Sequence, residues 1–163
     1  MKKNSNTAPA PRRIFIVEDH AEFRQCLSEI VSDQDDLMVC GQAGDAEHAR
    51  RAINHLKPDL VLVDLALPGK SGLDLIKEVR TSNRTIKFLV VSMHHEALYA
   101  ERVLRAGGDG YIMKQEHPDE IVNAMQDLLR GHIYLSEAII SGPMGGARTG
   151  RFKKERDGWL KAA

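Results

Sequence analysis

Residues 60–69 read Leu-Val-Leu-Val-Asp-Leu-Ala-Leu-Pro-Gly, an apolar run that ends in the carboxylate of Asp64. A short, continuous apolar run bounded by proline and glycine is typical of a strand buried on both faces of a sheet. Three similar runs elsewhere in the chain end in polar residues, in this order along the sequence: Glu18-Asp19, Ser92 and Lys114. The chain therefore places acid, acid, hydroxyl and amine at the ends of four predicted strands.

Amphipathic segments separate these strands. Apolar residues recur at helical spacing in five segments, which we predict to be helices: 21–32, 46–56, 72–80, 97–106 and 118–130. The predicted strands are 14–17, 37–43, 60–64, 86–92 and 110–113. The strict alternation of strands and helices along the chain predicts an α/β fold, a doubly wound (βα)5 sandwich with helices on both faces of a parallel sheet. Right-handed crossovers restrict the possible topologies. The expected fold is flavodoxin-like with strand order 2-1-3-4-5, in which the first and third strands are neighbours.

Parallel strands gather their carboxyl ends at one edge of a sheet, so Glu18, Asp19 and Asp64 are expected to meet there. Carboxylates held together repel one another, and a hard cation relieves that repulsion. Mg²⁺ prefers oxygen ligands. We expect Asp19, Asp64 and the backbone carbonyl of Ala66 to bind it directly, and Glu18 to act through water. The alternative is a set of acidic caps facing solvent.

Lys114 and Ser92 complete the predicted site. The ammonium group of Lys114 reaches Asp64 or a phosphate placed on it, and the hydroxyl of Ser92 bonds a phosphoryl oxygen. A carboxylate can act as a nucleophile and form an aspartyl-phosphate. Such transfer depends on positioning and charge neutralisation. A solvated lysine and a serine that caps a helix remain the simpler alternatives.

The motif order resembles the receiver domain of two-component response regulators, over residues 13–131. Several details are similar to the NarL/FixJ branch of that family: Val17-Glu18-Asp19-His20 with Arg24 one turn later, Ser92-Met93-His94, and Leu129-Arg130-Gly131 followed by Tyr134-Leu135-Ser136. The resemblance implies a CheY-like fold in which Asp64 is the phosphoacceptor. It also implies that Glu18, Asp19 and Asp64 bind Mg²⁺, that Ser92 and Lys114 sense the phosphoryl group, and that Tyr111 is the switch aromatic.

The same resemblance implies a signalling role. A sensor histidine kinase or phosphotransfer protein would phosphorylate Asp64, and the face formed by residues 97–130 would switch and control an effector or form a homodimer. Such a module is not a turnover enzyme. A phosphatase or phosphotransferase with an aspartyl intermediate is the alternative. However, haloacid-dehalogenase-type enzymes require a second aspartate two residues after the nucleophile, and this chain has Ala66 at that position. A nucleotide binder and a scaffold with an inactive site are further alternatives.

The two ends of the chain differ from its middle. Residues 1–12 are predicted to be a disordered lead, and residues 132–163 an extension with a glycine-rich linker and a basic tail. Members of the NarL/FixJ branch usually continue into a helix-turn-helix domain. Only 21 residues follow Gly142, too few for three packed helices, so specific DNA binding is not expected. A truncated transcriptional regulator is the alternative.

Composition gives no support to nucleic-acid-binding, membrane or secreted classes of protein. The 23 Lys and Arg residues balance 23 Asp and Glu residues, which gives no bias toward nucleic acid or an anionic membrane. No apolar stretch approaches the ~20 residues that a membrane helix needs, and no signal peptide is visible. We therefore expect a cytoplasmic protein. Cys26 and Cys40 lie in apolar patterns and are expected to be buried free thiols.

Overall fold

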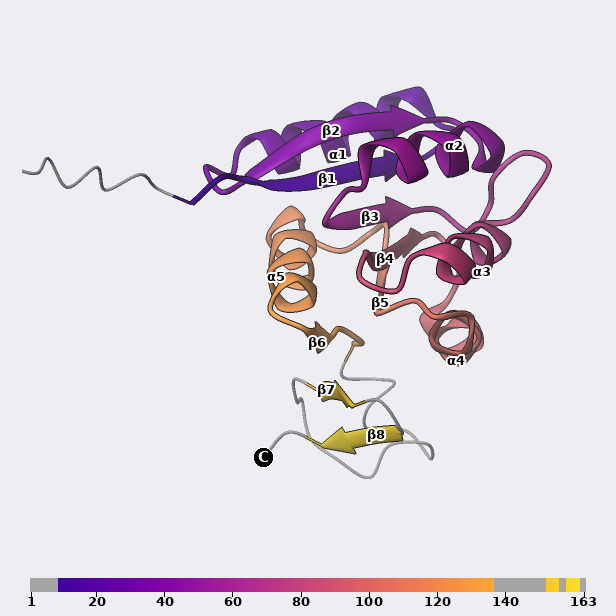
Figure 1. Cartoon of the computed structure of the whole chain (residues 1–163). Coiled ribbons are helices and arrows are strands. Elements are labelled where there is room, and N and C mark those ends of the chain that lie inside the picture. The colour runs from indigo at the N-terminus through magenta and orange to yellow at the C-terminus, as the bar shows by residue number, and fades with distance from the viewer. Residues whose placement is uncertain (1–8, 137–151, 156–157, 162–163) are drawn as a thin grey trace, which may run out of the picture.

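The computed structural model describes residues 9–136, 152–155 and 158–161 (Figure 1). Its main sheet has five parallel strands in the order β2-β1-β3-β4-β5, which confirms the predicted doubly wound topology. The strands are β1 (Arg12–Val17), β2 (Leu37–Ala43), β3 (Leu60–Val63), β4 (Lys87–Ser92) and β5 (Gly110–Met113). The helices are α1 (Ala21–Ser32), α2 (Ala46–Leu56), α3 (Gly72–Ser82), α4 (Glu96–Ala106) and α5 (Pro118–Leu129).

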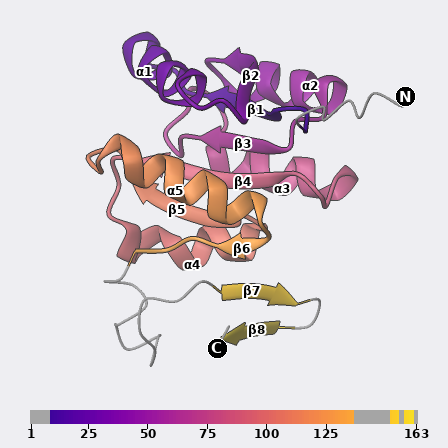
Figure 2. The same cartoon turned by 90° about the vertical axis from the view of Figure 1, so that its left-hand side faces the viewer.

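The helices form two layers around this sheet. Figure 2 shows α1 and α5 in front of the strands, with α3 and α4 behind them. Alternation along β3 explains how the sheet serves both layers: Val61 and Val63 pack into the core under α2, α3 and α4, whereas Leu60 and Leu62 pack into the core under α1 and α5. All four side chains are completely buried. The continuous apolar run in the sequence is therefore the signature of the central strand.

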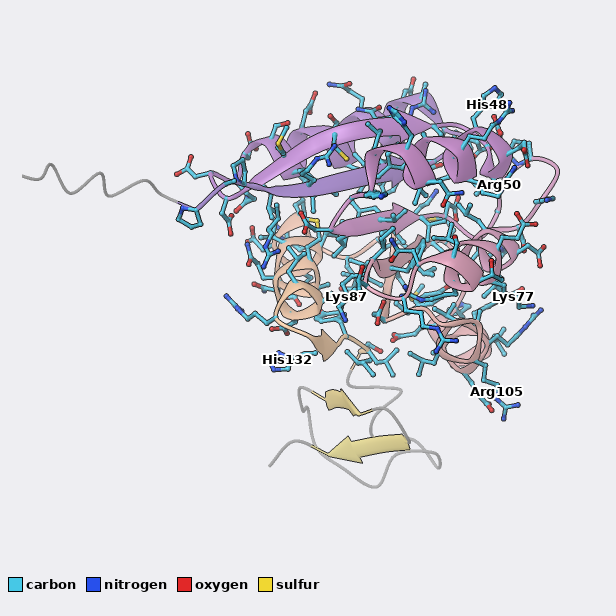
Figure 3. The ribbon with its side chains drawn as sticks, viewed as in Figure 1. His48, Arg50, Lys77, Lys87, Arg105 and His132 are labelled. Atoms are coloured by element: carbon cyan, nitrogen blue, oxygen red, sulfur yellow. The ribbon has the colours of Figure 1, made fainter. Side chains whose placement is uncertain are left out.

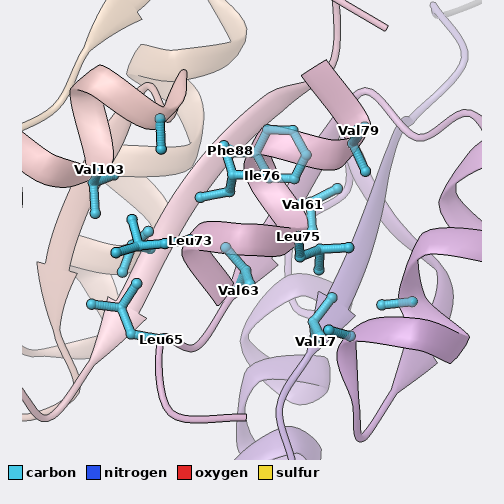
Figure 4. Packing of buried hydrophobic residues seen from close by; sticks show 14 of the residues in the cluster. Val17, Val61, Val63, Leu65, Leu73, Leu75, Ile76, Val79, Phe88 and Val103 are labelled. Atoms are coloured by element: carbon cyan, nitrogen blue, oxygen red, sulfur yellow. The ribbon is translucent and has the colours of Figure 1, made fainter. Parts of the chain in front are cut away.

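The core beneath α3 is drawn in Figure 4. Val61 and Val63 of β3 lie beside Leu75 and Ile76 of α3 in one cluster of buried side chains. Full burial of each such aliphatic side chain is worth about 1.5–3 kcal/mol. This packing fixes β3, and with it the position of the residue that follows the strand.

Several element boundaries differ from the prediction by one or two residues. β1 begins at Arg12 because its N–H donates to the carbonyl of Asp36 at 2.8 Å, so the predicted lead is one residue too long. α3 runs to Ser82 rather than to residue 80, and α4 begins at Glu96 rather than at residue 97. Lys57, in the left-handed conformation with φ of 49°, ends α2 ahead of the proline.

The C-terminal extension contains secondary structure that the sequence analysis does not assign. β6 (His132–Ile133) pairs antiparallel with β7 (Phe152–Glu155), which pairs antiparallel with β8 (Gly158–Lys161). Pairing between segments far apart in the chain leaves little local signal in the sequence. The predicted glycine-rich linker lies outside the described residues.

The expected burial of the two thiols is wrong. Both cysteines are free, but Cys26 is exposed and Cys40 is half-buried. Cys26 precedes the buried Leu27 on α1 and therefore points away from the sheet.

Charged side chains cover the outer surfaces of the helices. His48 and Arg50 project from α2 and Lys77 from α3 (Figure 3). Lys70, in the loop between β3 and α3, pairs with Glu78 at 2.7 Å, so this loop is tied to α3 by an exposed ion pair of modest strength. No helix in the described parts of the chain is long and apolar enough to cross a bilayer.

Gly72, the first residue of α3, is required by the close approach of α3 to the end of β3. Its N–H donates to the carbonyl of Leu65 at 3.1 Å, and a Cβ built on it would overlap the carbonyl oxygen of Asp64. We predict that Gly72→Ala lowers the free energy of unfolding by about 1–3 kcal/mol, because backbone must move to make room. Urea denaturation measures this loss.

Gly44→Ala is the matched control, since the nearest atom to its added Cβ lies at 3.6 Å, an ordinary contact. Equal stability of the two variants would show that the approach of Gly72 to Asp64 is not a constraint.

Candidate functional site

Asp64 lies directly after β3, at the carboxyl edge of the sheet. Its N–H donates to the carbonyl of Val17, the last residue of β1, at 3.0 Å. This hydrogen bond holds Asp64 beside Glu18, the residue that follows Val17. Asp64 is 5% exposed and Glu18 is 1% exposed. The strand pairing thus brings two carboxylates together where little water can solvate them.

Lys114 joins these two carboxylates. Its Nζ lies 2.6 Å from Glu18 Oε2 and 2.9 Å from Asp64 Oδ2. The N–H of Lys114 donates to the carbonyl of Ser92 at 2.9 Å, so the end of β5 is fixed to the end of β4. Buried charges are tolerated when they are paired and hydrogen-bonded. One ammonium group therefore offsets one of the two negative charges at the centre of the site.

The pKa values of this group follow from burial and pairing. Burial raises the pKa of Glu18, and the hydrogen bond from Lys114 opposes that change. Burial by itself lowers the pKa of Lys114, but hydrogen bonds to Glu18 and Asp64 outweigh it and raise the pKa overall. Lys114 is therefore held as a cation at neutral pH.

Phe23 is a site residue that the sequence analysis places within the predicted helix 21–32 and does not single out. Its ring, in the first turn of α1, lies beneath the ammonium group of Lys114, with 4.7 Å between Nζ and the ring centroid. This is the geometry of a cation–π interaction. Its only signal in the sequence is an aromatic residue in the helical turn that follows the acidic pair.

Asp19 and His20 form the open side of the site. Ligand atoms of Glu18, Asp19 and His20 lie within 4.8 Å of one another, and the Asp19 side chain is 38% exposed. Arg24 donates to the carbonyls of Glu18 at 2.6 Å and Asp19 at 3.3 Å and so holds the loop between β1 and α1. An exposed carboxylate beside buried ones is a donor set that fits a hard cation.

Ala66, whose backbone carbonyl is the third predicted ligand of Mg²⁺, lies two residues after Asp64. Its N–H donates to Asp64 Oδ1 at 3.3 Å, so it is part of the turn that directs the Asp64 carboxylate.

Ser92, the last residue of β4, and Tyr111 in β5 both contact His94 in the loop between β4 and α4. Ser92 is 1% exposed, and its Oγ accepts a hydrogen bond from the N–H of His94 at 3.3 Å. The hydroxyl of Tyr111 donates to the carbonyl of the same residue at 2.7 Å. Burial raises the pKa of Tyr111 to about 12, so its phenol remains a donor. Both predicted switch residues therefore bind one loop residue.

Known proteins match this arrangement. The family profile of the response regulator receiver domain matches residues 14–126. The chain belongs to this family. The predicted resemblance is confirmed.

The nitrate/nitrite response regulator protein NarL of Escherichia coli K12 is 30% identical to the chain over 153 residues, which cover 94% of this chain and 70% of NarL. Response regulator GacA of Pseudomonas viridiflava is 34% identical over 127 residues, 78% of this chain and 59% of GacA. The chain thus spans little more than half the length of GacA.

Solved structures agree with these relatives. A LuxR-family two-component response regulator from Aurantimonas sp. SI85-9A1 has a TM-score of 0.77 at 30% identity, over 81% of this chain and 94% of that one. The signal receiver domain of NarL from Mycobacterium tuberculosis has a TM-score of 0.72 at 29% identity, and the match covers 76% of this chain and 99% of that one. The structure is thus a receiver domain in fold as well as in sequence.

Removal of the Lys114 ammonium group should leave two buried carboxylates without a cation. We predict that Lys114→Ala lowers the free energy of unfolding by about 3 kcal/mol near pH 7. Because burial holds the folded-state pKa of Glu18 above its usual value, ionisation of Glu18 destabilises the folded variant, and the loss should shrink as the pH falls and Glu18 protonates. Urea denaturation from neutral to acidic pH measures the effect.

Lys77→Ala, at an exposed position of α3, is the control and should change stability little at any pH. A loss in Lys114→Ala that is independent of pH would argue against the paired carboxylates as its cause.

Proposed function

We propose that the chain accepts a phosphoryl group on Asp64 from a sensor histidine kinase or a phosphotransfer protein. One observation supports this most: the Asp64 carboxylate is buried, directed by the Ala66 N–H and paired with Lys114 at 2.9 Å, all at the carboxyl edge of a receiver-family sheet. The other atoms around Asp64 suit the same chemistry.

Transfer would proceed by attack of an Asp64 carboxylate oxygen on phosphorus. The new oxygen–phosphorus bond forms as the bond from phosphorus to the imidazole nitrogen of the donor breaks; because the other ring nitrogen of the donor carries a proton before transfer, the imidazole leaves in its neutral form. Lys114 would move from the carboxylate to a phosphoryl oxygen and neutralise part of its charge. Ser92, whose hydroxyl is buried nearby, would give a second hydrogen bond to the phosphoryl group.

We assign the metal ligands as predicted: Asp19, Asp64 and the carbonyl of Ala66 directly, and Glu18 through water. When bound, Mg²⁺ neutralises the charge of the transferred phosphoryl oxygens. Asp19 is the accessible member of this set, so its exposed carboxylate would admit the cation from solvent.

Phosphorylation adds a charge of about −1.5 to −2 at this edge. As Ser92 turns toward the phosphoryl group, room opens for Tyr111, and the face built from residues 97–130 changes shape. An effector or a second copy in a homodimer would bind that face. The protein would act in the cytoplasm as a switch rather than a turnover enzyme, and would not by itself bind specific DNA.

Transcriptional regulation is a second candidate. DegU of Brevibacillus brevis, described as a transcriptional regulatory protein, is 27% identical to this chain over 54% of the length of DegU. An aspartyl-phosphate phosphatase has no comparable support.

The test is incubation of the full chain with acetyl phosphate and Mg²⁺, followed by intact-mass measurement. We predict one phosphoryl adduct per chain, lost on treatment with base and absent when the metal is chelated. Asp64→Asn should prevent labelling. Asp35 is exposed and lies between α1 and β2, before the amino end of a strand, so Asp35→Asn should be labelled like the parent. Equal labelling of Asp64→Asn and the parent would refute the assignment.

A further inference from the structure

The segment after α5 extends the main sheet beyond β5. The N–H of Tyr111 donates to the carbonyl of Tyr134 at 2.9 Å, and the N–H of Tyr134 donates to the carbonyl of Asp109 at 3.2 Å. Gly110 and Tyr134 form a parallel bridge, and β6 lies next to α5 in both views (Figures 1 and 2). Residues 132–136 thus occupy the edge of β5, within the face expected to switch.

Two further hydrogen bonds fasten this segment to the helices on either side. The hydroxyl of Tyr134 donates to Glu120 Oε2 in α5 at 2.8 Å. The N–H of Ser136 donates to Glu96 Oε1 at 2.8 Å. Glu96 is the first residue of α4 and is 5% exposed. A carboxylate buried to this degree needs hydrogen-bond donors, so the Ser136 N–H stabilises the start of α4 in its present position.

The start of α4 is also the end of the loop that begins at Ser92. This loop is held by the Tyr111 hydroxyl on the His94 carbonyl and by the His94 ring, which stacks on the Tyr99 ring with centroids 5.0 Å apart. Tyr111 therefore connects this loop to the segment after α5: its hydroxyl binds His94 in the loop, and its backbone N–H binds Tyr134. The segment 132–136 reaches the loop through Tyr111 and through Glu96.

We propose that residues 132–136 are an intramolecular effector of the phosphorylation site: the hydrogen bond from Ser136 to Glu96 positions the loop that carries Ser92 in its resting arrangement. The proposal rests on the proposed function of Asp64. Glu96 is a positioning residue, because it acts on Ser92 through the loop and not on the phosphoryl group.

A mechanical consequence follows for the phosphorylated state. When the Ser92 side chain turns toward a phosphoryl oxygen, its Oγ moves away from the His94 N–H, whose hydrogen bond it accepts at 3.3 Å in the present structure, and the loop and the start of α4 move with it. That movement pulls the Glu96 carboxylate from Ser136 and frees the segment. By linkage, a chain without this hydrogen bond should favour the phosphorylated arrangement.

Amide hydrogen exchange of the full chain tests the coupling without any phosphoryl donor. Glu96→Ala removes the acceptor, and Ser136→Pro removes the N–H donor. Both should speed exchange by about tenfold at His94 and Tyr111, whose N–H groups are hydrogen-bonded in the present arrangement, the factor expected for loss of one hydrogen bond to a charged group. Glu96→Gln keeps an uncharged Oε1 acceptor, and Ser136→Ala keeps the backbone N–H but removes the side-chain hydroxyl, which also bonds Glu96. Both should therefore exchange at rates between those of the parent and of Glu96→Ala.

Beryllofluoride with Mg²⁺ gives the second readout. The Glu96→Ala and Ser136→Pro chains should bind it about tenfold more tightly than the parent, and the two conservative variants should bind it with affinities between these and the parent. Unaltered exchange at His94 and Tyr111 in both disruptive variants, or binding as tight in Ser136→Ala as in Ser136→Pro, would overturn the proposal. A parent that fails to bind beryllofluoride would refute the proposed function, whereas the exchange data would still decide the positioning.

Discussion

The ammonium group of Lys114, shared between the buried carboxylates of Glu18 and Asp64, is the interaction on which the site depends. The three residues come from the ends of β1, β3 and β5, so the ion pairs form only when the sheet is assembled in the observed order. Without the cation, two carboxylates with no more than 6% side-chain exposure would repel each other and lose hydration. The acidic edge, where we propose that phosphoryl transfer occurs, is thus also an electrostatic constraint on the fold.

The architecture separates rigid parts from adjustable ones. The apolar side chains of β3 and α3 fill the core and fix the backbone of Asp64, while Gly72 permits the close approach of α3 to that backbone. The loop after Ser92 is held instead by single hydrogen bonds, each of which can be exchanged for another at a small net difference in free energy. Added charge at Asp64 can therefore reorganise this loop and its neighbours while the packed core stays as it is.

Much of this could be predicted from the sequence, for definite physical reasons. Strand β3 is buried on both faces, so its residues had to be uniformly apolar, and its polar successor Asp64 had to lie at the sheet edge. The handedness of crossovers limits the possible strand orders, and the family resemblance implies the observed order. The pairing of Lys114 with Asp64 follows from their places at two strand ends. The pairing of Lys114 with Glu18, the ring of Phe23 beneath that cation and the hydrogen bond between Ser136 and Glu96 depend instead on side-chain positions in three dimensions. Local periodicity carries no record of such contacts, nor of the pairing of β6 with β7.

The most direct test of the central interaction is a double-mutant cycle between Asp64 and Lys114. The unfolding free energies of the parent, Asp64→Asn, Lys114→Met and the double variant would be measured by urea denaturation near pH 7. The shared buried cation predicts a coupling of about 1.5–3 kcal/mol, the range for a hydrogen bond to a charged group. Losses that simply add, with no coupling between the two positions, would contradict the role of Lys114 as the cation that holds the site together.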